Sequence, residues 1–310
     1  MKVSVCTLAH GRAEHLRNLV RGLIESAWQP EELVVAVLQD DLYVLPDTPF
    51  PIRQVRPSAQ GLSLAAARNQ AAANATGDLL VFLDVDCIPH PALIGDYVWV
   101  AAQNDGIFMG EVGYLPKGTD YDPLDFRLLE DQSVKHTERA GPPDGALGRC
   151  RDYRCFWSLN FALTQNTFRD VGGFDEGYVG YGGEDTDFGR VCTERGHPLW
   201  WVKGAKSYHQ YHPHHMPPVH HVDSVIANAE YFASKWGEPT MQHWLRAFRL
   251  MGLAAPGEAG WRRLRAVNED DLALTRQQEH EPYASTRVVL DWLEEQHTKE
   301  PCPTLLVRNQ

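Results

Sequence analysis

The sequence predicts an α/β fold with a mixed, mostly parallel sheet flanked by helices. Two observations in the first ninety residues predict it. Short apolar runs of strand length alternate with longer segments whose apolar residues recur at helical spacing. Acidic side chains, among them Asp40 and Asp84, follow these apolar runs directly. Sheets of this kind bind ligands at the carboxyl ends of their strands.

The N-terminal elements are expected in the order strand, helix, strand, strand, helix, strand. Strands are expected at 2–9, 33–38, 52–55 and 78–83, and helices at 16–24 and 62–74. Parallel strands bring their carboxyl ends to one edge of a sheet. We expect five side chains at this edge: Thr7, Asp40, Arg56, Asp84 and Asp86.

The remainder of the chain divides into a loop-like region and a second ordered part. Residues 117–153 mix Gly, Pro and charge around a helix candidate at 124–132, and we expect them to form a flap that follows a strand at 107–115. Further elements are expected as a helix from about 183, a strand at 199–202, and helices at 225–236, 244–253 and 286–295. The predicted domains are 1–212, which carries the sheet, and 213–310, a mainly helical extension.

Composition excludes several classes of protein. The net charge of −12 and the pI near 5.6 argue against binding to nucleic acid, which requires a basic surface. No stretch approaches the roughly 20 apolar residues of a membrane span. The 6 cysteines form no Cys-x-x-Cys pair, and no signal peptide is evident, so we expect free thiols and a cytoplasmic protein. Nothing in the sequence predicts the oligomeric state.

Asp84-Val85-Asp86 is the most informative motif. Side chains alternate along a strand, so we expect its two carboxylates to project to the same face. Paired carboxylates suit a divalent cation that also binds phosphate oxygens. Alone, the motif more often marks a strand that ends in two solvated aspartates.

Two further motifs, one around Arg68 and one at 182–188, carry charged residues that could take part in binding or catalysis. Arg68 lies on the helix before the Asp84 strand, where its guanidinium either faces solvent or binds phosphate and carboxylate oxygens. In the run 182–188, two glycines precede Glu184, Asp185 and Asp187. Acidic residues in a first helical turn satisfy free N–H groups, and they also suit general-base chemistry on a hydroxyl.

Histidines and aromatic residues supply the last candidates. Residues 208–221 hold six of the 14 histidines in a spacing that matches no standard zinc motif. His209, close behind the strand at 199–202, is the expected third metal ligand beside Asp84 and Asp86, with His212 as the alternative. Trp157 and Asn160 suit a sugar-binding pocket. The sequence is equally consistent with Trp157 as a core residue and Asn160 as a turn residue.

Taken in order, these motifs resemble the family 2 glycosyltransferases with a GT-A fold. The resemblance rests on Ala67-Arg68-Asn69, Phe82-Leu-Asp-Val-Asp86, Gly172-Gly-Phe-Asp-Glu176 and Gly182-Gly-Glu-Asp-Thr-Asp-Phe188. The last motif is similar to the C-terminal part of galactosyltransferases and polypeptide N-acetylgalactosaminyltransferases. The resemblance covers about residues 1–212.

The resemblance implies a hexosyltransferase that moves a sugar from a nucleotide-diphospho-sugar, with UDP favoured, to a hydroxyl of a carbohydrate or other acceptor. It implies Mn²⁺ or Mg²⁺ as cofactor and an inverting reaction with Asp185 as the base. The implied sites are Thr7, Ala9, Arg12, Asp40, Arg68 and Asp84 for the nucleotide donor, Asp84, Asp86 and His209 for the metal, and Trp157, Asn160, Gly183 and Glu184 for the acceptor, with Glu184 also beside the chemistry.

Three alternatives stay open from the sequence. A retaining transferase on the same fold differs only in the anomeric outcome. A sugar-phosphate nucleotidyltransferase normally carries a Gly-rich basic loop after its first strand, for which His10-Gly11-Arg12 is a poor substitute. A non-catalytic module that binds nucleotide sugars requires no base such as Asp185.

Overall fold

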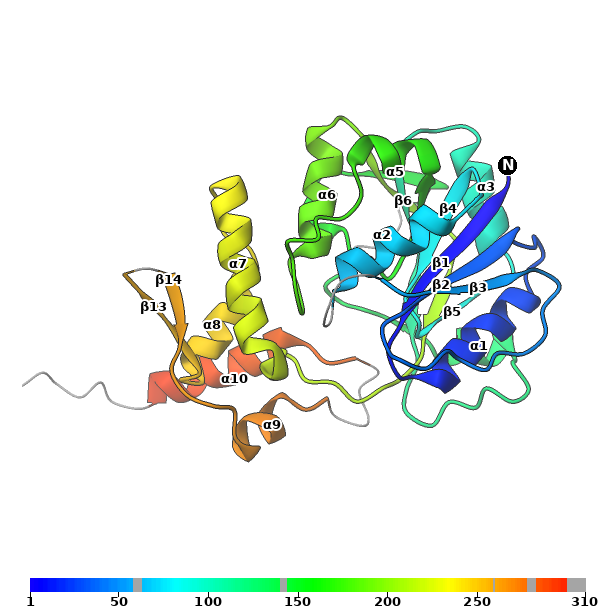
Figure 1. Cartoon of the computed structure of the whole chain (residues 1–310). Coiled ribbons are helices and arrows are strands. Elements are labelled where there is room, and N and C mark those ends of the chain that lie inside the picture. Colours follow the sequence, from blue (N-terminus) through cyan, green and yellow to red (C-terminus); the bar gives the residue numbers. More distant parts are fainter. Residues whose placement is uncertain (58–62, 140–143, 259, 278–282, 300–310) are drawn as a thin grey trace, which may run out of the picture.

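A computed structural model of the protein describes residues 1–57, 63–139, 144–258, 260–277 and 283–299. The N-terminal part is built on a large twisted sheet with helices on both faces (Figure 1). In chain order its elements are β1 (Val3–Ala9), α1 (Ala13–Ile24), β2 (Glu32–Val37), β3 (Ile52–Val55), α2 (Leu64–Asn74), β4 (Leu79–Leu83), β5 (Cys87–Pro89), α3 (Leu93–Ala101), β6 (Ile107–Met109), β7 (Val112–Tyr114), α4 (Phe126–Gln132), β8 (Val134–Lys135), β9 (Leu147–Cys150), β10 (Asn160–Thr164), α5 (Gln165–Val171), α6 (Glu184–Glu194), β11 (Leu199–Val202) and β12 (Ser207–His209).

The main sheet has the strand order β3-β2-β1-β4-β10-β6-β11-β9. β3, β2, β1 and β4 pair in parallel, as the sequence predicts. β10 runs antiparallel to both β4 and β6, and β11 pairs in parallel with β6. β4, β6 and β11 therefore point in the same direction, and their carboxyl ends lie at one edge of the sheet.

Strand alternation divides the core into two layers. In β4, Leu79, Val81 and Leu83 pack with α1 and α3 on one face. Leu80 and Phe82 pack with α2, α5 and α6 on the other. Both faces are apolar because helices cover both, which explains why this strand reads as a continuous hydrophobic run.

The predicted strand at 107–115 is wrong in one respect, because it is two strands in two sheets. β6 lies in the main sheet, and β7 belongs to a four-stranded sheet in the order β5-β12-β7-β8. Gly110 stands at the break, where an added Cβ would lie 2.2 Å from the carbonyl oxygen of Ala205. The close approach of these chains explains the glycine.

The region 117–153, expected as a flap, contains α4, β8 and β9. α4 occupies most of the expected helix at 124–132, and β9 pairs with β11 as an edge strand of the main sheet. Residues 140–143, which hold the Gly141-Pro-Pro part of this region, lie outside the described residues.

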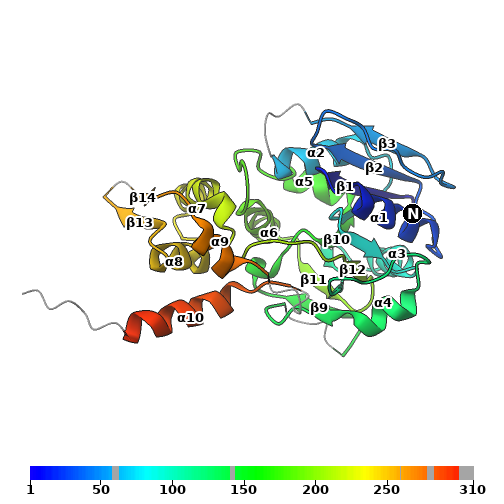
Figure 2. The ribbon, with the colours of Figure 1, turned by 90° about the horizontal axis from the view of Figure 1, so that it is seen from below.

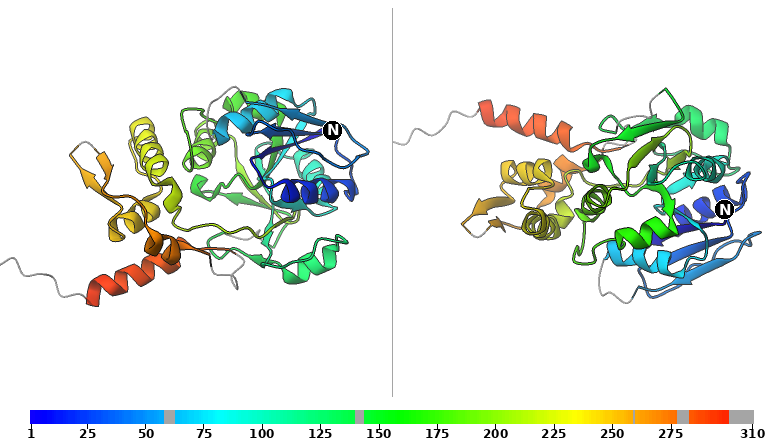
Figure 3. Two further views of the ribbon diagram at one scale, coloured as in Figure 1. Left: turned by 60° about the horizontal axis from the view of Figure 1, so that its bottom comes forward. Right: turned by 90° about the horizontal axis from the view of Figure 1, so that it is seen from above.

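The C-terminal elements form their own apolar cluster beside the sheet, with α7 next to α6 (Figures 1 and 2). They are α7 (Val222–Trp236), α8 (Gln242–Leu250), β13 (Ala254–Gly257), β14 (Gly260–Arg263), α9 (Glu269–Thr275) and α10 (Thr286–Lys299). The sequence predicts the three longer helices but neither the hairpin β13–β14 nor α9. α10 packs against α8 and projects away from the sheet (Figure 3). Among the described helices, none has the length and apolar character that a membrane crossing requires.

Candidate active site

The candidate site begins where β4 ends. The strand stops at Leu83, and Asp84 to Cys87 form a turn closed by a hydrogen bond from Cys87 N to Asp84 O of 2.9 Å. The prediction that Asp84 and Asp86 share one strand face is therefore wrong, since strand alternation does not extend into a turn. The turn directs the two carboxylates to different partners.

Asp86 faces two histidines and an arginine. Its carboxylate oxygens lie 3.4 Å from His209 Nε2 and 3.2 Å from His212 Nε2. Arg12 donates a close hydrogen bond to Asp86, and its other terminal nitrogen lies 3.3 Å from His212 Nδ1. Burial alone would raise the pKa of Asp86, but His209, His212 and Arg12 together hold it well below its usual range.

The donor atoms of Asp86, His209 and His212 fit one metal ion. One ligand atom from each residue lies within 4.8 Å of the others. Two ligands about 2.1 Å from a common ion, at roughly 90–110°, stand about 3.0–3.4 Å apart, which matches the distances from Asp86 to each histidine. Burial lowers the pKa of His209 to about 4, so the imidazole is neutral and able to bind a cation. Its Nδ1 is buried and has no hydrogen-bond partner in the part of the chain that the structure describes.

Asp84 instead joins a buried arginine. Arg68 on α2 is only 5% exposed, and it donates to Asp84 Oδ1 at 3.4 Å and to Glu184 Oε1 at 3.2 Å. Phe174 supports the guanidinium from 5.3 Å. Burial raises the pKa of Asp84 to about 6, although Arg68 opposes the shift. The functional interpretation of Arg68, as a partner of the acidic motif, matches this geometry.

α6 brings its acidic start to the same cluster. Glu184 is buried against Arg68, and Asp185 interacts electrostatically with Arg68, Glu184 and Asp84. Burial, followed by the charge of Glu184, raises the pKa of Asp185 to about 7. A carboxylate with such a pKa is well suited to accept a proton near neutral pH.

The third carboxylate of the run has a structural role that the sequence does not reveal. Asp187 is 1% exposed and accepts hydrogen bonds from Lys235 Nζ at 2.9 Å, Trp236 Nε1 at 2.6 Å and Tyr178 OH at 3.1 Å. It thereby fixes α6 to the end of α7. Asn228 on α7 adds a hydrogen bond of 2.8 Å to the carbonyl of Gly182.

The two glycines before α6 are packed against protein. Gly182 and Gly183 have φ of 88° and 95°, a region that disfavours side chains. An added Cβ at Gly182 would lie 2.8 Å from Met241 Sδ and 2.9 Å from Trp244 Cζ3. The backbone at Gly182 therefore approaches the side chains of Met241 and Trp244 at the start of α8. These side chains hold the loop that precedes Glu184 and Asp185.

The expected nucleotide residues cluster around the ends of β1 and β2. Gly11 N donates to Gln39 Oε1 at 2.8 Å, which joins the turn containing Arg12 to the loop containing Asp40. Asp40 is exposed, and its carbonyl accepts a close hydrogen bond from Arg56. Thr7 and Ala9 are buried in β1, and Thr7 Oγ1 has no hydrogen-bond partner within the described residues.

Trp157 and Asn160, two of the four expected acceptor residues, differ in their surroundings. Asn160 is fully buried, with its amide bonded to Tyr97, Glu111 and Ala205, so it has no free group for a ligand. Trp157 is partly exposed and joins an aromatic cluster that the sequence does not predict. Ring contacts connect its members in the order Trp157, His136, Tyr114 and His209, and Tyr283 stacks on His136. These residues come from distant segments, so no local pattern identifies them.

Comparison with known proteins agrees with this geometry. A family model described as glycosyl transferase family 2 matches residues 4–157, and one described as the N-terminal domain of galactosyltransferase matches residues 146–215. Together they span both acidic motifs and His209. The N-terminal half of the chain, residues 4–157, belongs to the family 2 glycosyltransferases. Its second matched segment is galactosyltransferase-like, as the motif at 182–188 predicts.

Curated relatives are distant. The validoxylamine A glucosyltransferase of Streptomyces hygroscopicus subsp. limoneus is 26% identical over 75% of this chain and 56% of its own length. An uncharacterised glycosyltransferase of Bacillus subtilis is 25% identical over 76% of this chain and 71% of its own. The hyaluronan synthase of Pasteurella multocida is 29% identical over 52% of this chain and 19% of its own. The chain thus spans about half of the first of these proteins and less of the synthase.

Solved structures support the GT-A fold. S. aureus TarS 1–349 in complex with UDP-GlcNAc superposes with a TM-score of 0.51 at 13% identity, over 68% of this chain and 59% of that one. GalNAc-T7 with UDP, GalNAc and Mn²⁺ gives 0.50 at 16% identity, over 68% and 43%. At this identity the likeness establishes the fold alone.

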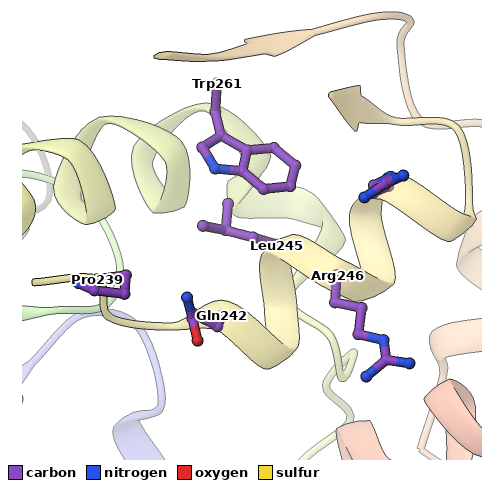
Figure 4. Close-up of a pocket in the computed structure, with 6 residues that line it drawn as sticks. Pro239, Gln242, Leu245, Arg246 and Trp261 are labelled. Atoms are coloured by element: carbon purple, nitrogen blue, oxygen red, sulfur yellow. The ribbon is translucent and has the colours of Figure 1, made fainter. Parts of the chain in front are cut away.

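A separate cavity lies on the C-terminal part. It has a volume of about 470 Å³ and is lined by Pro239, Gln242, Leu245, Arg246, Arg249 and Trp261. Figure 4 shows the indole of Trp261 from β14 above Leu245, with Gln242 and Arg246 along α8. None of the candidate catalytic residues contributes to its lining.

Proposed function

We propose that the protein is a metal-dependent, inverting glycosyltransferase that uses a nucleotide-diphospho-sugar, with UDP as the favoured nucleotide. The observation that carries the proposal is the division of the acidic motifs into two adjoining groups. Asp86 forms one with His209 and His212, and Arg68 forms the other with Asp84 and Glu184. The complexes of TarS with UDP-GlcNAc and of GalNAc-T7 with UDP and Mn²⁺ support the donor class.

Asp86, His209 and His212 would hold the metal, and we favour Mn²⁺ over Mg²⁺ because Mg²⁺ prefers oxygen ligands and imidazole suits transition metals. When bound, the ion supplies positive charge that stabilises the departing diphosphate. Arg12, already in contact with Asp86, would border the same diphosphate. Thr7, Ala9 and Asp40 remain the proposed contacts for the nucleoside, with Asp40 beside the base.

Asp185 would act as the general base. Its carboxylate takes the proton of the acceptor hydroxyl while the acceptor oxygen bonds to the anomeric carbon. The bond from that carbon to the diphosphate oxygen breaks, and its electron pair leaves with the nucleoside diphosphate. Glu184 is held by Arg68 and would position the acceptor, together with the Gly183 backbone and Trp157. Attack opposite the leaving group inverts the anomeric centre.

Donor hydrolysis tests the proposal without knowledge of the acceptor. The protein would be incubated with a panel of UDP- and GDP-sugars in Mn²⁺ or in EDTA, and the released nucleotide measured. We expect release from at least one donor in Mn²⁺, none in EDTA, and a loss of about 10²-fold or more in Asp185→Asn once an acceptor is found. Failure of every donor to bind or react in Mn²⁺ would contradict the assignment. NMR of the product anomer separates inverting from retaining transfer.

A further inference from the structure

A small cationic cavity lies at the sheet edge that carries the proposed active site. It has a volume of about 160 Å³, and its charged lining residues are Lys135, Arg139, Lys206 and Glu111. Other lining residues directly follow β6 or are the last residues of β11. Because these strands run in the direction of β4, the cavity and Asp84 lie at the same edge, with β10 between β4 and β6.

Arg139 is the unusual member of this lining. It is 6% exposed, and its Nη2 donates to Gly110 O at 3.2 Å. Among the described residues, its Nη1 is buried without a hydrogen-bond partner and has no carboxylate within 4.0 Å. The guanidinium lies near the rings of Trp201 and Trp157, with its carbon 5.3 Å and 5.9 Å from their centroids.

The neighbouring charges do not compensate Arg139. The carboxylate of Glu111 accepts a hydrogen bond of 2.7 Å from Gly204 N, and Lys206 is paired with Glu130 at 2.6 Å. Lys135 is exposed at the cavity and has no ion pair within the part of the chain that the structure describes. Burial lowers the pKa of Arg139, which reflects the same lack of compensation. A buried cation without a partner is costly, so a bound anion would be stabilised here.

We propose that this cavity binds a carboxylate or phosphate group carried by the acceptor, so that the acceptor is an anionic hydroxyl compound. The oxyanion would accept a hydrogen bond from Lys135, which is exposed at the cavity, and its charge would compensate the buried guanidinium of Arg139 in the cavity wall. The inference rests on the proposed transferase function, because only that function makes the bound molecule an acceptor.

The position of the cavity assigns it to the acceptor. Of the proposed donor residues, Thr7, Ala9, Asp40 and Arg68 lie on or after β1, β2 and α2, on one side of β4, whereas the cavity lies on the β6–β11 side. Trp157 contacts Arg139 on one hand and His136 on the other, and it was expected at an acceptor site from the sequence. An anionic group held by Arg139 would therefore place the rest of its molecule near Trp157.

Calorimetric titration tests the site directly. The probes are methyl glucuronide and glycerol 3-phosphate, which carry the two anions on hydroxyl compounds, with inorganic phosphate for comparison, all in EDTA at constant ionic strength. We expect at least one organic probe to bind, with affinity reduced about tenfold or more in Arg139→Gln and several-fold in Lys135→Gln. Arg149→Gln is the matched control. Arg149 on β9 lies over Trp200, the neighbour of Trp201 in β11, but it is exposed.

The outcomes separate this proposal from the proposed function. Binding of methyl glucuronide that persists with saturating UDP and Mn²⁺ supports a site distinct from the donor site, and displacement by UDP contradicts it. Binding of inorganic phosphate alone would show an ion site and overturn the acceptor assignment, as would the absence of any response. Lys135 is exposed, so Lys135→Gln keeps the test decisive if Arg139→Gln fails to fold. Failure of UDP to bind while the organic probes bind would instead contradict the transferase.

Discussion

The same substitution at two positions on α6 should have opposite effects on stability. Asp187→Asn removes the charge that pairs with Lys235 at 2.9 Å. The amide nitrogen of the new side chain is a donor, and it would face the donor Nζ of Lys235. The amide oxygen can still accept from Trp236 and Tyr178, so we expect a loss smaller than that of a fully broken buried pair. Charged hydrogen bonds of this kind are worth about 1.5–3 kcal/mol, which gives a loss of about 2–3 kcal/mol and, for a chain of 310 residues, roughly 3–5 °C in Tm.

Asp185→Asn should instead leave the protein at least as stable as the wild type. Burial and the charge of Glu184 raise the pKa of Asp185 from 3.8 to about 7, so the folded protein binds this proton more tightly than the unfolded chain. The wild type therefore loses stability as pH rises from about 4 to about 7, and Asp185→Asn does not. The advantage of the variant is complete at pH 8 and shrinks as the pH falls towards 5.

Urea unfolding in EDTA at pH 8 and pH 5.5 measures both variants against the wild type. We expect a lower midpoint for Asp187→Asn at both pH values. For Asp185→Asn we expect a midpoint equal to or above that of the wild type at pH 8, with a smaller difference at pH 5.5. Equal destabilisation of the two variants would refute the division of α6 into a catalytic and a structural carboxylate. So would an Asp187→Asn protein with the stability of the wild type.

Two other predictions concern the same helix start. The transfer rate should rise with pH up to about 7 and then level, because Asp185 accepts a proton only when ionised; a flat profile between pH 5.5 and 8 would exclude it as the base. Gly182→Ala should be markedly less stable than Gly237→Ala in thermal unfolding. Both glycines have positive φ, but only at Gly182 does an added Cβ meet Met241 and Trp244; equal Tm losses would contradict the packing argument.

The sequence predicts the fold well because the N-terminal elements are locally consistent. β1, β2 and β4 are covered on both faces, and α1 has a clear apolar stripe. Each element can therefore be predicted from the pattern of its own residues. The short strands β5, β7 and β12 are only three residues each and depend on pairing across the chain, so no local period marks them.

The sequence indicates individual residues of the candidate site, but it does not predict which of their side chains contact one another. Asp84 and Asp86 have different partners because a turn begins where the strand was expected to continue. The preceding run of five apolar residues does not reveal where the strand ends. Asp187 resembles its acidic neighbours in sequence, and only the approach of α7 separates it from them. Likewise, Arg139 stands out only when its burial and its unpartnered nitrogen are known.

Metal-dependent nucleotide binding tests the central claim most directly. Calorimetric titration with UDP would compare Mn²⁺ with EDTA for the wild type, Asp86→Ala and the exposed control Asp105→Ala. We predict that Mn²⁺ tightens UDP binding by about tenfold (about 1.4 kcal/mol) or more in the wild type and the control, and that Asp86→Ala loses this gain. Equal UDP affinity with and without Mn²⁺, or an unchanged gain in Asp86→Ala, would contradict the assignment of Asp86, His209 and His212 as the metal site.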